Sequence, residues 1–472
     1  MKTCMKIAVR FTVLLALVVG CNSDLEEEVF SQASPSAYFT SKGDVNTALN
    51  GMYDPIQRCC GGYSQQRSMV LNTVSDEGDM TWSNRGNYDE LIFDATSNSD
   101  HVAMWNSNYL AINAANFVLD NADKIRGLDD TADGSFANPA LGEAAFWRGI
   151  VYFDNVRLFG DVPLRTSVAQ TKEELNIPRS PEEDVYAQII EDLEFAVANL
   201  PTESTEQGRP ISWAAKAYLA KVHLTIGNFD SALEVARDVV NNGPYNLVTP
   251  FSAIFDVNNE GNEEVIFAIQ YVRVNLEGSR MAWLATGNNT EFANFGRGGV
   301  GLQFVEEGMF EKYSEEDDRR ATTFASLEPH PDNGRYYYGK WRDPQGISID
   351  GHENNFITLR FADVLLILAE AANEVGGPSA EAYDAINRVR TRAMLPDLEA
   401  GLSESAFRDA VMFERHLELA LEQHRWFDLK RTGRLEDVLT ATGRPWDSRY
   451  LLFPIGQQEL DASDALEQNP GY

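Results

Sequence analysis

Three glutamates late in the chain are the residues whose type and spacing most directly suggest catalysis. Glu414, Glu418 and Glu422 follow one another at intervals of four residues, and paired carboxyl groups are the acid and base of glycoside hydrolysis. Those enzymes place their carboxyl groups across the sugar, about 5–9 Å apart and normally on different elements. Carboxylates four residues apart on one helix repel each other unless cations lie nearby. Cations are available at Arg388, Arg390, Arg392, Arg415 and Arg425. We therefore predict structural ion pairs and no catalytic residue here.

Other stretches resemble cofactor or metal-binding motifs, but the residues around them do not fit such sites. "GRGGVG" (296–301) has the spacing of a dinucleotide loop but follows "NNTEFANF", which is not a buried strand. "DVNNEGNEEVIF" (256–267) begins like a calcium loop, but its twelfth residue is Phe267 where a bidentate Glu is needed, which leaves only a looser calcium site open. The six histidines form no metal or triad spacing. We therefore predict no enzyme activity, no cofactor and no metal.

Aromatic residues in polar surroundings indicate ligand binding instead. Trp82 has Asp79 before it, Asn84 and Arg85 beside it and Tyr88 after it, in a stretch of low apolar content. Flat rings pack on the C–H faces of sugars while neighbouring polar groups bond the hydroxyls. A second stretch adds four candidates, which are Trp283, Arg297, Tyr336 and Trp341. We predict that these nine residues contribute to a ligand-binding face, whereas Trp105, Trp147, Trp213 and Trp426 lie in helices and belong to the core.

Cys21 is a candidate for covalent lipid attachment. Residues 1–20 combine a basic start with the nine-residue apolar run 11–19, which is too short to span a bilayer and is typical of a signal peptide. The run ends in "VVGC", which resembles the bacterial lipobox, where the thiol of the cysteine is alkylated with lipid. We predict a signal peptide over 1–20 and a lipidated N-terminus and tether over 21–40. A conventional signal peptide with a chance cysteine is the alternative.

The net charge and the pair Cys59–Cys60 further narrow the possible classes of protein. The chain has 472 residues and a formal net charge of −33, which argues against nucleic acid as a partner because phosphate contacts need a positive face. Cys59 and Cys60 are adjacent, without metal or redox spacing. They are interpreted as structural thiols, with a strained vicinal disulfide as the alternative.

The candidate residues lie between segments with helical periodicity. We predict a mainly α fold with helix pairs at about 99–159, 182–242, 356–393 and 403–432. In residues 215–244, Ala220 and Ala232 are 12 residues apart on either side of a turn at Gly227. That spacing matches the 34-residue tetratricopeptide frame, in which small residues let two antiparallel helices approach closely. Two loop-rich segments, at about 61–98 and 245–345, interrupt the array and carry the candidate binding residues.

The order of motifs along the chain resembles the SusD/RagB family of outer-membrane, nutrient-binding lipoproteins. The similar stretches run from end to end: "VNTALNGMYDPI" (45–56), "SDEGD" (75–79), "RLFGDVPL" (157–164), residues 213–240, "NEEVIFAIQY" (262–271), "LRFADVLLILAEAANEVG" (359–376), "AINRVRTRA" (385–393), "ERHLELALEQHRWFDLKRTG" (414–433) and "LEQNPGY" (466–472). No single stretch is specific, but their common order is.

The resemblance implies one SusD-like domain over 41–472, with four tetratricopeptide-like helix pairs and the irregular segments as its ligand face. It implies a nutrient ligand, such as an oligosaccharide or polysaccharide, and a TonB-dependent outer-membrane transporter of the SusC type as partner. It also implies a position outside the outer membrane. Asp24, Glu26, Glu27 and Glu28 resemble the export signal that follows the lipidated cysteine in such proteins, with a solvated tether as the alternative. A lipid-anchored glycoside hydrolase and a helical-repeat scaffold without small-ligand binding remain the rival functions.

Overall fold

A computed structural model describes most of the chain after the predicted tether. It covers residues 38–58, 62–80, 88–96, 100–131, 133–204, 206–274, 276–285, 301–330 and 334–472. The predicted signal peptide, Cys21 and the pair Cys59–Cys60 lie outside these residues, as does the "GRGGVG" stretch apart from its last glycine. Within the described residues, no helix is both long enough and apolar enough to cross a membrane.

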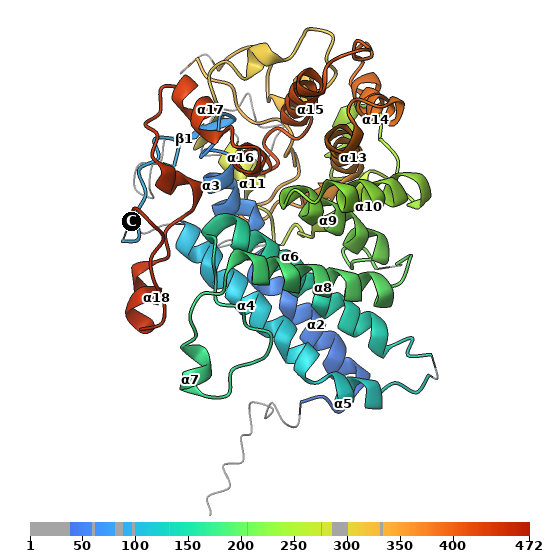
Figure 1. Cartoon of the computed structure of the whole chain (residues 1–472), viewed down its shortest axis with the longest axis vertical. Helices are drawn as coiled ribbons and strands as arrows, with labels where there is room; N and C mark the ends of the chain where they lie inside the picture. Colours follow the sequence, from blue (N-terminus) through green and yellow to red (C-terminus); the bar gives the residue numbers. More distant parts are fainter. Residues whose placement is uncertain are drawn as a thin grey trace, which may run out of the picture.

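The first half of the molecule is a layered stack of helices. Each helix packs on the next in the order α2, α4, α6, α8, α9 and α10, and Figure 1 shows α2, α4, α6 and α8 lying side by side. Their bounds are Lys42–Gln57 (α2), Asp100–Asp120 (α4), Ala137–Phe159 (α6), Glu182–Asn199 (α8), Ser212–Thr225 (α9) and Phe229–Asn242 (α10).

Local sequence explains where these helices begin and end. Ser41 and Asp44 form a reciprocal capping box at the start of α2. Helix α6 is buried along almost its whole length and ends at Gly160, whose φ of 74° suits glycine. In the α9–α10 pair, Ala220 and Ala232 are fully buried on either side of the turn at Gly227. The tetratricopeptide-like pairing that their spacing predicted is confirmed.

The second half adds further helix pairs. Helix α13 (Phe361–Gly376) packs on α9, α10, α14 (Ala380–Arg392) and α15 (Glu404–Glu418). Serine side chains cap α14 and α15, at Ser379 and Ser403. The shorter helices are Ser68–Leu71 (α3), Ala122–Gly127 (α5), Lys172–Leu175 (α7), Met281–Ala285 (α11), Arg320–Thr323 (α12), Arg425–Arg431 (α16), Leu435–Ala441 (α17) and Gln457–Ala462 (α18). Single turns of 3₁₀ helix cover Phe251–Ile254, Phe310–Lys312 and Ser448–Leu451, and a π-helix covers Tyr63–Arg67.

The loop-rich segments contribute two small antiparallel ladders. Strand β1 (Gly78–Met80) pairs with β3 (Gln303–Val305), which places Asp79 opposite Phe304. Strand β2 (Val265–Ile269) pairs with β4 (Phe356–Arg360), and the last residue of β4 is the N-cap of α13. Each ladder therefore joins segments that are far apart in the sequence, and β4 connects one of them directly to the helical stack.

The three glutamates at four-residue intervals form buried ion pairs, as predicted, but with partly different partners and on different elements. Helix α15 ends at Glu418, and Leu421 and Gln423 then adopt positive φ, so Glu422 lies in a turn before α16. Glu414 pairs with Arg390 and Arg319, and Glu418 with Arg392, Arg360 and Arg319. Glu422 pairs with Arg360 and Lys340. Arg415 and Arg425, which the sequence also offered, pair with Asp363, Asp428 and Asp76 instead.

Candidate functional site

Five of the nine predicted ligand-binding residues lie in the described part of the chain. Those five are Asp79, Tyr88, Trp283, Tyr336 and Trp341. Trp82, Asn84, Arg85 and Arg297 lie outside the described residues. The structure separates the five into two groups, because Asp79 and Tyr336 are partly exposed whereas the other three are buried.

Asp79 is the centre of a polar cluster on the β1–β3 ladder. Its carboxylate lies 2.9 Å from the guanidinium of Arg335, and both side chains are partly exposed, at 30% and 41%. The Arg335 guanidinium lies 4.6 Å from the centre of the Phe304 ring, directly across the ladder from Asp79. We call Asp79, Asp89, Phe304, Glu306 and Arg335 the Asp79 cluster. An acid and an arginine beside an aromatic ring can bond several hydroxyl groups while a ring packs on an apolar face.

The Asp79 cluster contains one carboxyl group, that of Asp89, whose pKa lies close to neutral pH. Burial and, after it, the hydrogen bond with Asp79 together raise the pKa of Asp89 to about 7. Burial also raises the pKa of Glu306, which the nearby Arg444 guanidinium, 2.6 Å away, opposes. Below about pH 7, Asp89 is therefore a neutral acid that donates to the Asp79 carboxylate, which leaves Asp79 free to hold Arg335.

Aromatic rings flank the Asp79 cluster. Tyr337 packs on Phe304 with ring centres 5.0 Å apart. Tyr336 stacks on Phe310 with ring centres 4.1 Å apart and planes at 9°. Tyr336 is partly exposed, whereas Tyr337 and Phe310 are buried. Tyr336 is therefore the predicted aromatic residue whose ring is accessible beside this ladder.

Tyr88, Trp283 and Trp341 contribute to the core rather than to an exposed face. Their exposed fractions are 0%, 8% and 3%. The Tyr88 ring packs on Phe93 and Phe453, and its hydroxyl lies 3.1 Å from Nδ1 of His101. These three rings do not form an open platform, and polar neighbours in the sequence could not reveal that, because burial depends on segments distant along the chain.

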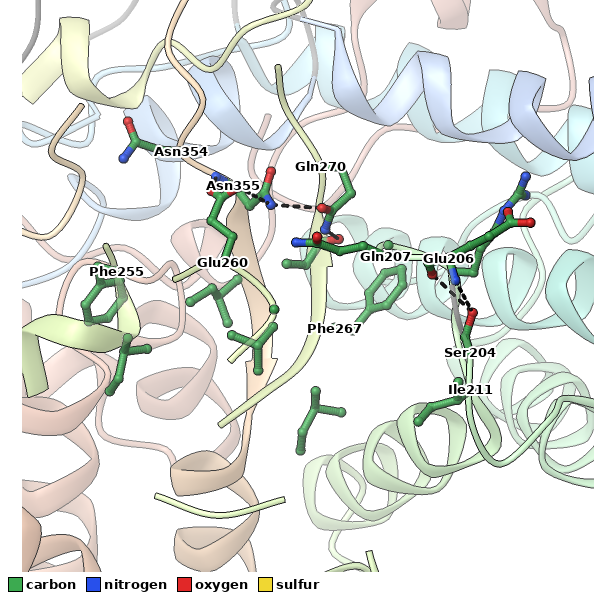
Figure 2. A pocket seen from close by; sticks show the side chains of 18 of the residues that line it. Ser204, Glu206, Gln207, Ile211, Phe255, Glu260, Phe267, Gln270, Asn354 and Asn355 are labelled. Carbon is green, nitrogen blue, oxygen red and sulfur yellow. Dashed lines mark hydrogen bonds and ion pairs between the residues drawn. The ribbon is translucent and has the colours of Figure 1, made fainter. Parts of the chain in front are cut away.

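A second feature, which the sequence did not suggest, is a cavity of about 230 Å³ beside the β2–β4 ladder. Figure 2 shows the side chains that line it, which come from the α8–α9 loop, from strand β2 and its approach, and from the residues around β4. The apolar wall includes Ile211, Tyr245, Phe255, Phe267, Trp341 and Ile357. The polar residues include Gln207, Arg209, Glu260, Gln270, Asn354 and Asn355. Trp341 is the one sequence-predicted residue that lines this cavity.

The polar side of the cavity is organised by Asn355. Its backbone N–H donates to Glu260 at 2.7 Å, and its side-chain amide donates to Glu260 and Gln270 at 2.8 Å each. Burial raises the pKa of Glu260 to about 7. At Gly208, with φ 85°, an added Cβ would lie 2.3 Å from Cγ of Gln270, so the loop approaches β2 closely only because this residue is glycine. A pair of asparagines before a strand was the available signal, but it is too common to predict a cavity.

Among the described residues, no group of three or more His, Cys, Asp or Glu side chains is arranged to hold a metal ion. In the stretch that begins like a calcium loop, Asp256 accepts hydrogen bonds from Asn258, and Glu264 pairs with Arg360 and Arg392. The carboxylates of Asp256 and Glu264 are therefore already engaged by other groups of the protein.

Stacked helix pairs that carry two loop-rich inserts define a class of helical binding proteins, and comparison with known proteins names the family. Residues 25–224 match a family model described as "Starch-binding associating with outer membrane", and residues 328–472 match the SusD family model. SusD-like protein P2 of Formosa agariphila is 30% identical over an alignment of 509 residues, which covers 99% of this chain and 100% of that protein. The chain therefore belongs to the SusD family, as its motifs indicated, and the mainly α, tetratricopeptide-like fold class is confirmed.

Solved structures of relatives agree over almost the whole chain. A protein described as a laminarin-binding SusD-like protein is 27% identical, with a TM-score of 0.80 and coverage of 92% of this chain and 100% of that one. A SusD homologue from Bacteroides thetaiotaomicron is 26% identical, with a TM-score of 0.81 and coverage of 93% and 98%. The mainly helical architecture is therefore a fold that these relatives share.

Proposed function

We propose that this protein is a cell-surface lipoprotein that binds a nutrient glycan and delivers it to a TonB-dependent outer-membrane transporter of the SusC type. The observation that carries the proposal is the match, over nearly all of both chains, to a solved relative whose description states that it binds laminarin. The family model over residues 25–224, which names starch binding and the outer membrane, supports the same class of ligand and the same location.

The geometry supports the Asp79 cluster as part of the glycan-binding face. It combines a partly exposed acid and a partly exposed arginine beside one short ladder, with the buried ring of Phe304 packed against the arginine. Tyr336 adds a partly exposed ring, one residue after Arg335 in the chain. The predicted residues Trp82, Asn84 and Arg85 follow β1 directly in the sequence. We propose that they complete this face, and the roles of Tyr88, Trp283, Arg297 and Trp341 stay predictions.

The anchor and the orientation of the protein are parts of the same proposal. Lipid on Cys21 would hold the chain at a membrane, because each buried methylene contributes about 0.8 kcal/mol. Residues 21–40 would be the tether and 41–472 the binding domain. The acidic residues at 24 and 26–28 are proposed to direct the protein to the outer face.

The burial and ion pairing of the three glutamates agree with a protein that binds its ligand without cleaving it. Glu414, Glu418 and Glu422 are at most 1% exposed, and each pairs with at least two cations. A general acid of a glycosidase must reach the glycosidic oxygen. Buried and ion-paired carboxylates cannot do so, which favours a binding protein over the hydrolase alternative at this position.

A glycan array followed by calorimetry tests the proposal, with laminarin as the first calorimetric probe. We expect the purified protein to bind at least one glycan and to leave it intact. Arg335→Ala removes a charged hydrogen-bond donor from the Asp79 cluster, so we expect about a tenfold loss of affinity. Arg237→Ala is the matched control, because Arg237 is similarly exposed, at 43%, and pairs with Glu381 on the helical stack.

Three results would contradict the proposal in different ways. Equal affinity of Arg335→Ala and the unchanged protein would remove the Asp79 cluster from the binding face. Shortened oligosaccharides after incubation would favour the hydrolase. No binding to any glycan, together with co-purification of a transporter, would favour the scaffold.

A further inference from the structure

The cavity beside the β2–β4 ladder is large enough for one six-membered ring and is built from residues outside the Asp79 cluster. Its volume is about 230 Å³, whereas an apolar cavity of about 150 Å³ is known to hold benzene. We propose that this cavity binds one uncharged sugar ring of the glycan, as a subsite separate from the Asp79 cluster. The inference rests on the proposed function, since it assigns a second contact to the same class of ligand.

The apolar wall suits the C–H face of a sugar ring. Phe255, Phe267 and Trp341 line the cavity together with aliphatic side chains from the α8–α9 loop and from both strands. Trp341 is held in place by Phe255 and Phe356, with ring centres 5.4 and 5.5 Å away. Aromatic rings fixed in this way lose little entropy when a ligand binds.

Buried polar atoms in the wall distinguish a sugar from a purely apolar ligand. Tyr245, Trp341 and Asn354 line the cavity and are 8%, 3% and 2% exposed. Among the described residues, none provides a hydrogen-bond partner for Tyr245 Oη, Trp341 Nε1 or Asn354 Oδ1. The Asn354 amide is oriented by its own donation to the carbonyl of Arg342 at 2.9 Å.

These three atoms comprise donors and an acceptor, and each exposes less than 1 Å², so they make the wall polar from just beneath its surface. A polar wall is poorly matched by an apolar ligand. A hydroxyl group both donates and accepts, and a sugar ring carries several. The polarity of the wall therefore favours a polyhydroxylated ring over a benzene-like ligand.

The charges around the cavity favour a neutral ligand over an anionic one. Glu206 and Glu260 both line it, against the single cation Arg209. Arg209 is already engaged, because its guanidinium lies 2.6 Å from Glu143 and 3.1 Å from Glu206. A uronate or a sulfated sugar would therefore meet carboxylates without a free cation to pair with.

The entrance lies between the α8–α9 loop, where Gln207 is exposed, and the end of β2, where Gln270 is half-buried. Figure 2 shows both amides between Glu206 and Phe255, close to Asn355. Amide side chains at an entrance can bond hydroxyls at the edge of a ring whose face lies on the wall.

Saturation-transfer NMR on the purified protein tests the proposal with defined probes. The neutral probes are the methyl glycosides of glucose, galactose, mannose and xylose, and glucuronate and benzene are the comparison ligands. We expect at least one neutral glycoside to bind, with glucuronate roughly tenfold weaker or absent because of the carboxylates. Ile211→Trp and Gln207→Trp both fill the entrance and should abolish that signal.

Ile226→Trp is the matched control, because Ile226 is 41% exposed at the opposite end of α9 from Ile211. Gln207 is exposed, so its replacement keeps the test valid even where Ile211→Trp fails to fold. The subsite is overturned by glycan-array binding without any methyl-glycoside signal, by a signal that survives both entrance variants, or by stronger binding of benzene or glucuronate. Loss of all array binding in the unchanged protein would instead contradict the proposed function itself.

Discussion

Helices α9 and α10 meet through apolar side chains, whereas β4 and the described residues of 301–345 meet helix α15 and the turn after it through buried ions in addition to an apolar cluster that includes Tyr313 and Leu417. In the α9–α10 pair, Ala220, Ala232 and Ala236 are fully buried between the helices. At the other junction, Arg319, Lys340 and Arg360 are at most 1% exposed and pair with glutamates on α15 and in the turn after it. The two regions are held together by different interactions.

The difference follows from the shape of the segments. A helix presents a continuous apolar stripe, so burial alone stabilises a pair of helices. Short strands and loops present less continuous apolar area than a helix, so directional bonds add to their apolar contacts in giving them one position. Arg360 alone donates to Glu264, Glu418 and Glu422. We infer that this ionic junction keeps the inserts, and with them both candidate binding sites, in register with the helical stack.

The largest expected effect comes from breaking the ionic junction. Glu418→Ala leaves Arg319, Arg360 and Arg392 with one carboxylate fewer in a fully buried place, and we expect the free energy of unfolding to fall by about 3–5 kcal/mol. Chemical denaturation measures this change in the free energy of unfolding. Glu381→Ala is the control, since Glu381 pairs with Arg237 at 38% exposure and should cost under about 1 kcal/mol. Equal losses in the two variants would mean that the ionic junction does not differ from a surface ion pair.

Shortening a buried apolar side chain in the helical stack should cause the next largest loss of stability. Leu365 is fully buried in α13, so Leu365→Ala should lower the free energy of unfolding by about 3 kcal/mol through lost apolar contact. Leu175→Ala serves as control, because Leu175 is 51% exposed in α7. Denaturation curves in which Leu365→Ala and Leu175→Ala coincide would contradict the apolar character assigned to this region.

A smaller and pH-dependent effect is expected at Glu77. This buried carboxyl accepts from the backbone N–H of Leu421 at 2.9 Å and so joins the β1 segment to the turn after α15. Burial raises its pKa from 4.5 to about 8. Because the folded-state pKa lies above the unfolded one, its stabilising contribution is complete below pH 4.5 and is lost as the pH rises through about 8.

Glu77→Gln removes this titration. We expect the variant to gain roughly 2 kcal/mol relative to the unchanged protein between pH 5 and pH 6.5, measured by denaturation at several pH values. Glu381→Gln should show no such gain, because hydrogen bonding to Arg237 lowers the pKa of Glu381 instead. Parallel pH profiles for the unchanged protein and Glu77→Gln would exclude a titrating Glu77 at this junction.

The helical part of the fold could be predicted from sequence because its signal is local. Apolar periodicity, caps such as Ser379 and Ser403, and the Ala220–Ala232 spacing all act within one or two helices. Glu414, Glu418 and Glu422 were expected on one helix, since nothing local reveals that Leu421 and Gln423 take positive φ. In that turn the backbone N–H of Leu421 donates a hydrogen bond to the carboxyl group of Glu77, which lies 344 residues earlier in the chain.

The candidate sites were less predictable because they combine distant segments. Asp79 and Tyr336 were identified from their polar surroundings, and the β1–β3 ladder lies beside both. Arg335, Asp89 and Phe304 were missed, since strand pairing places Phe304 opposite Asp79 and only the path of the loops brings Arg335 and Asp89 to it. Trp341 was chosen for its type, but it lines a buried cavity with Glu260 and Asn355.

By itself, the sequence determined the family, the helix pairs and the charge that disfavours nucleic acid, because composition, periodicity and motif order need no knowledge of distant contacts. It also predicts the lipidated Cys21. Only the tertiary structure decided which aromatic rings are exposed, which cations neutralise Glu414, Glu418 and Glu422, and that residues near 207, 260 and 355 enclose one cavity. The physical reason is that burial and pairing are properties of neighbours in space, and in the loop-rich segments those neighbours are far apart in the chain.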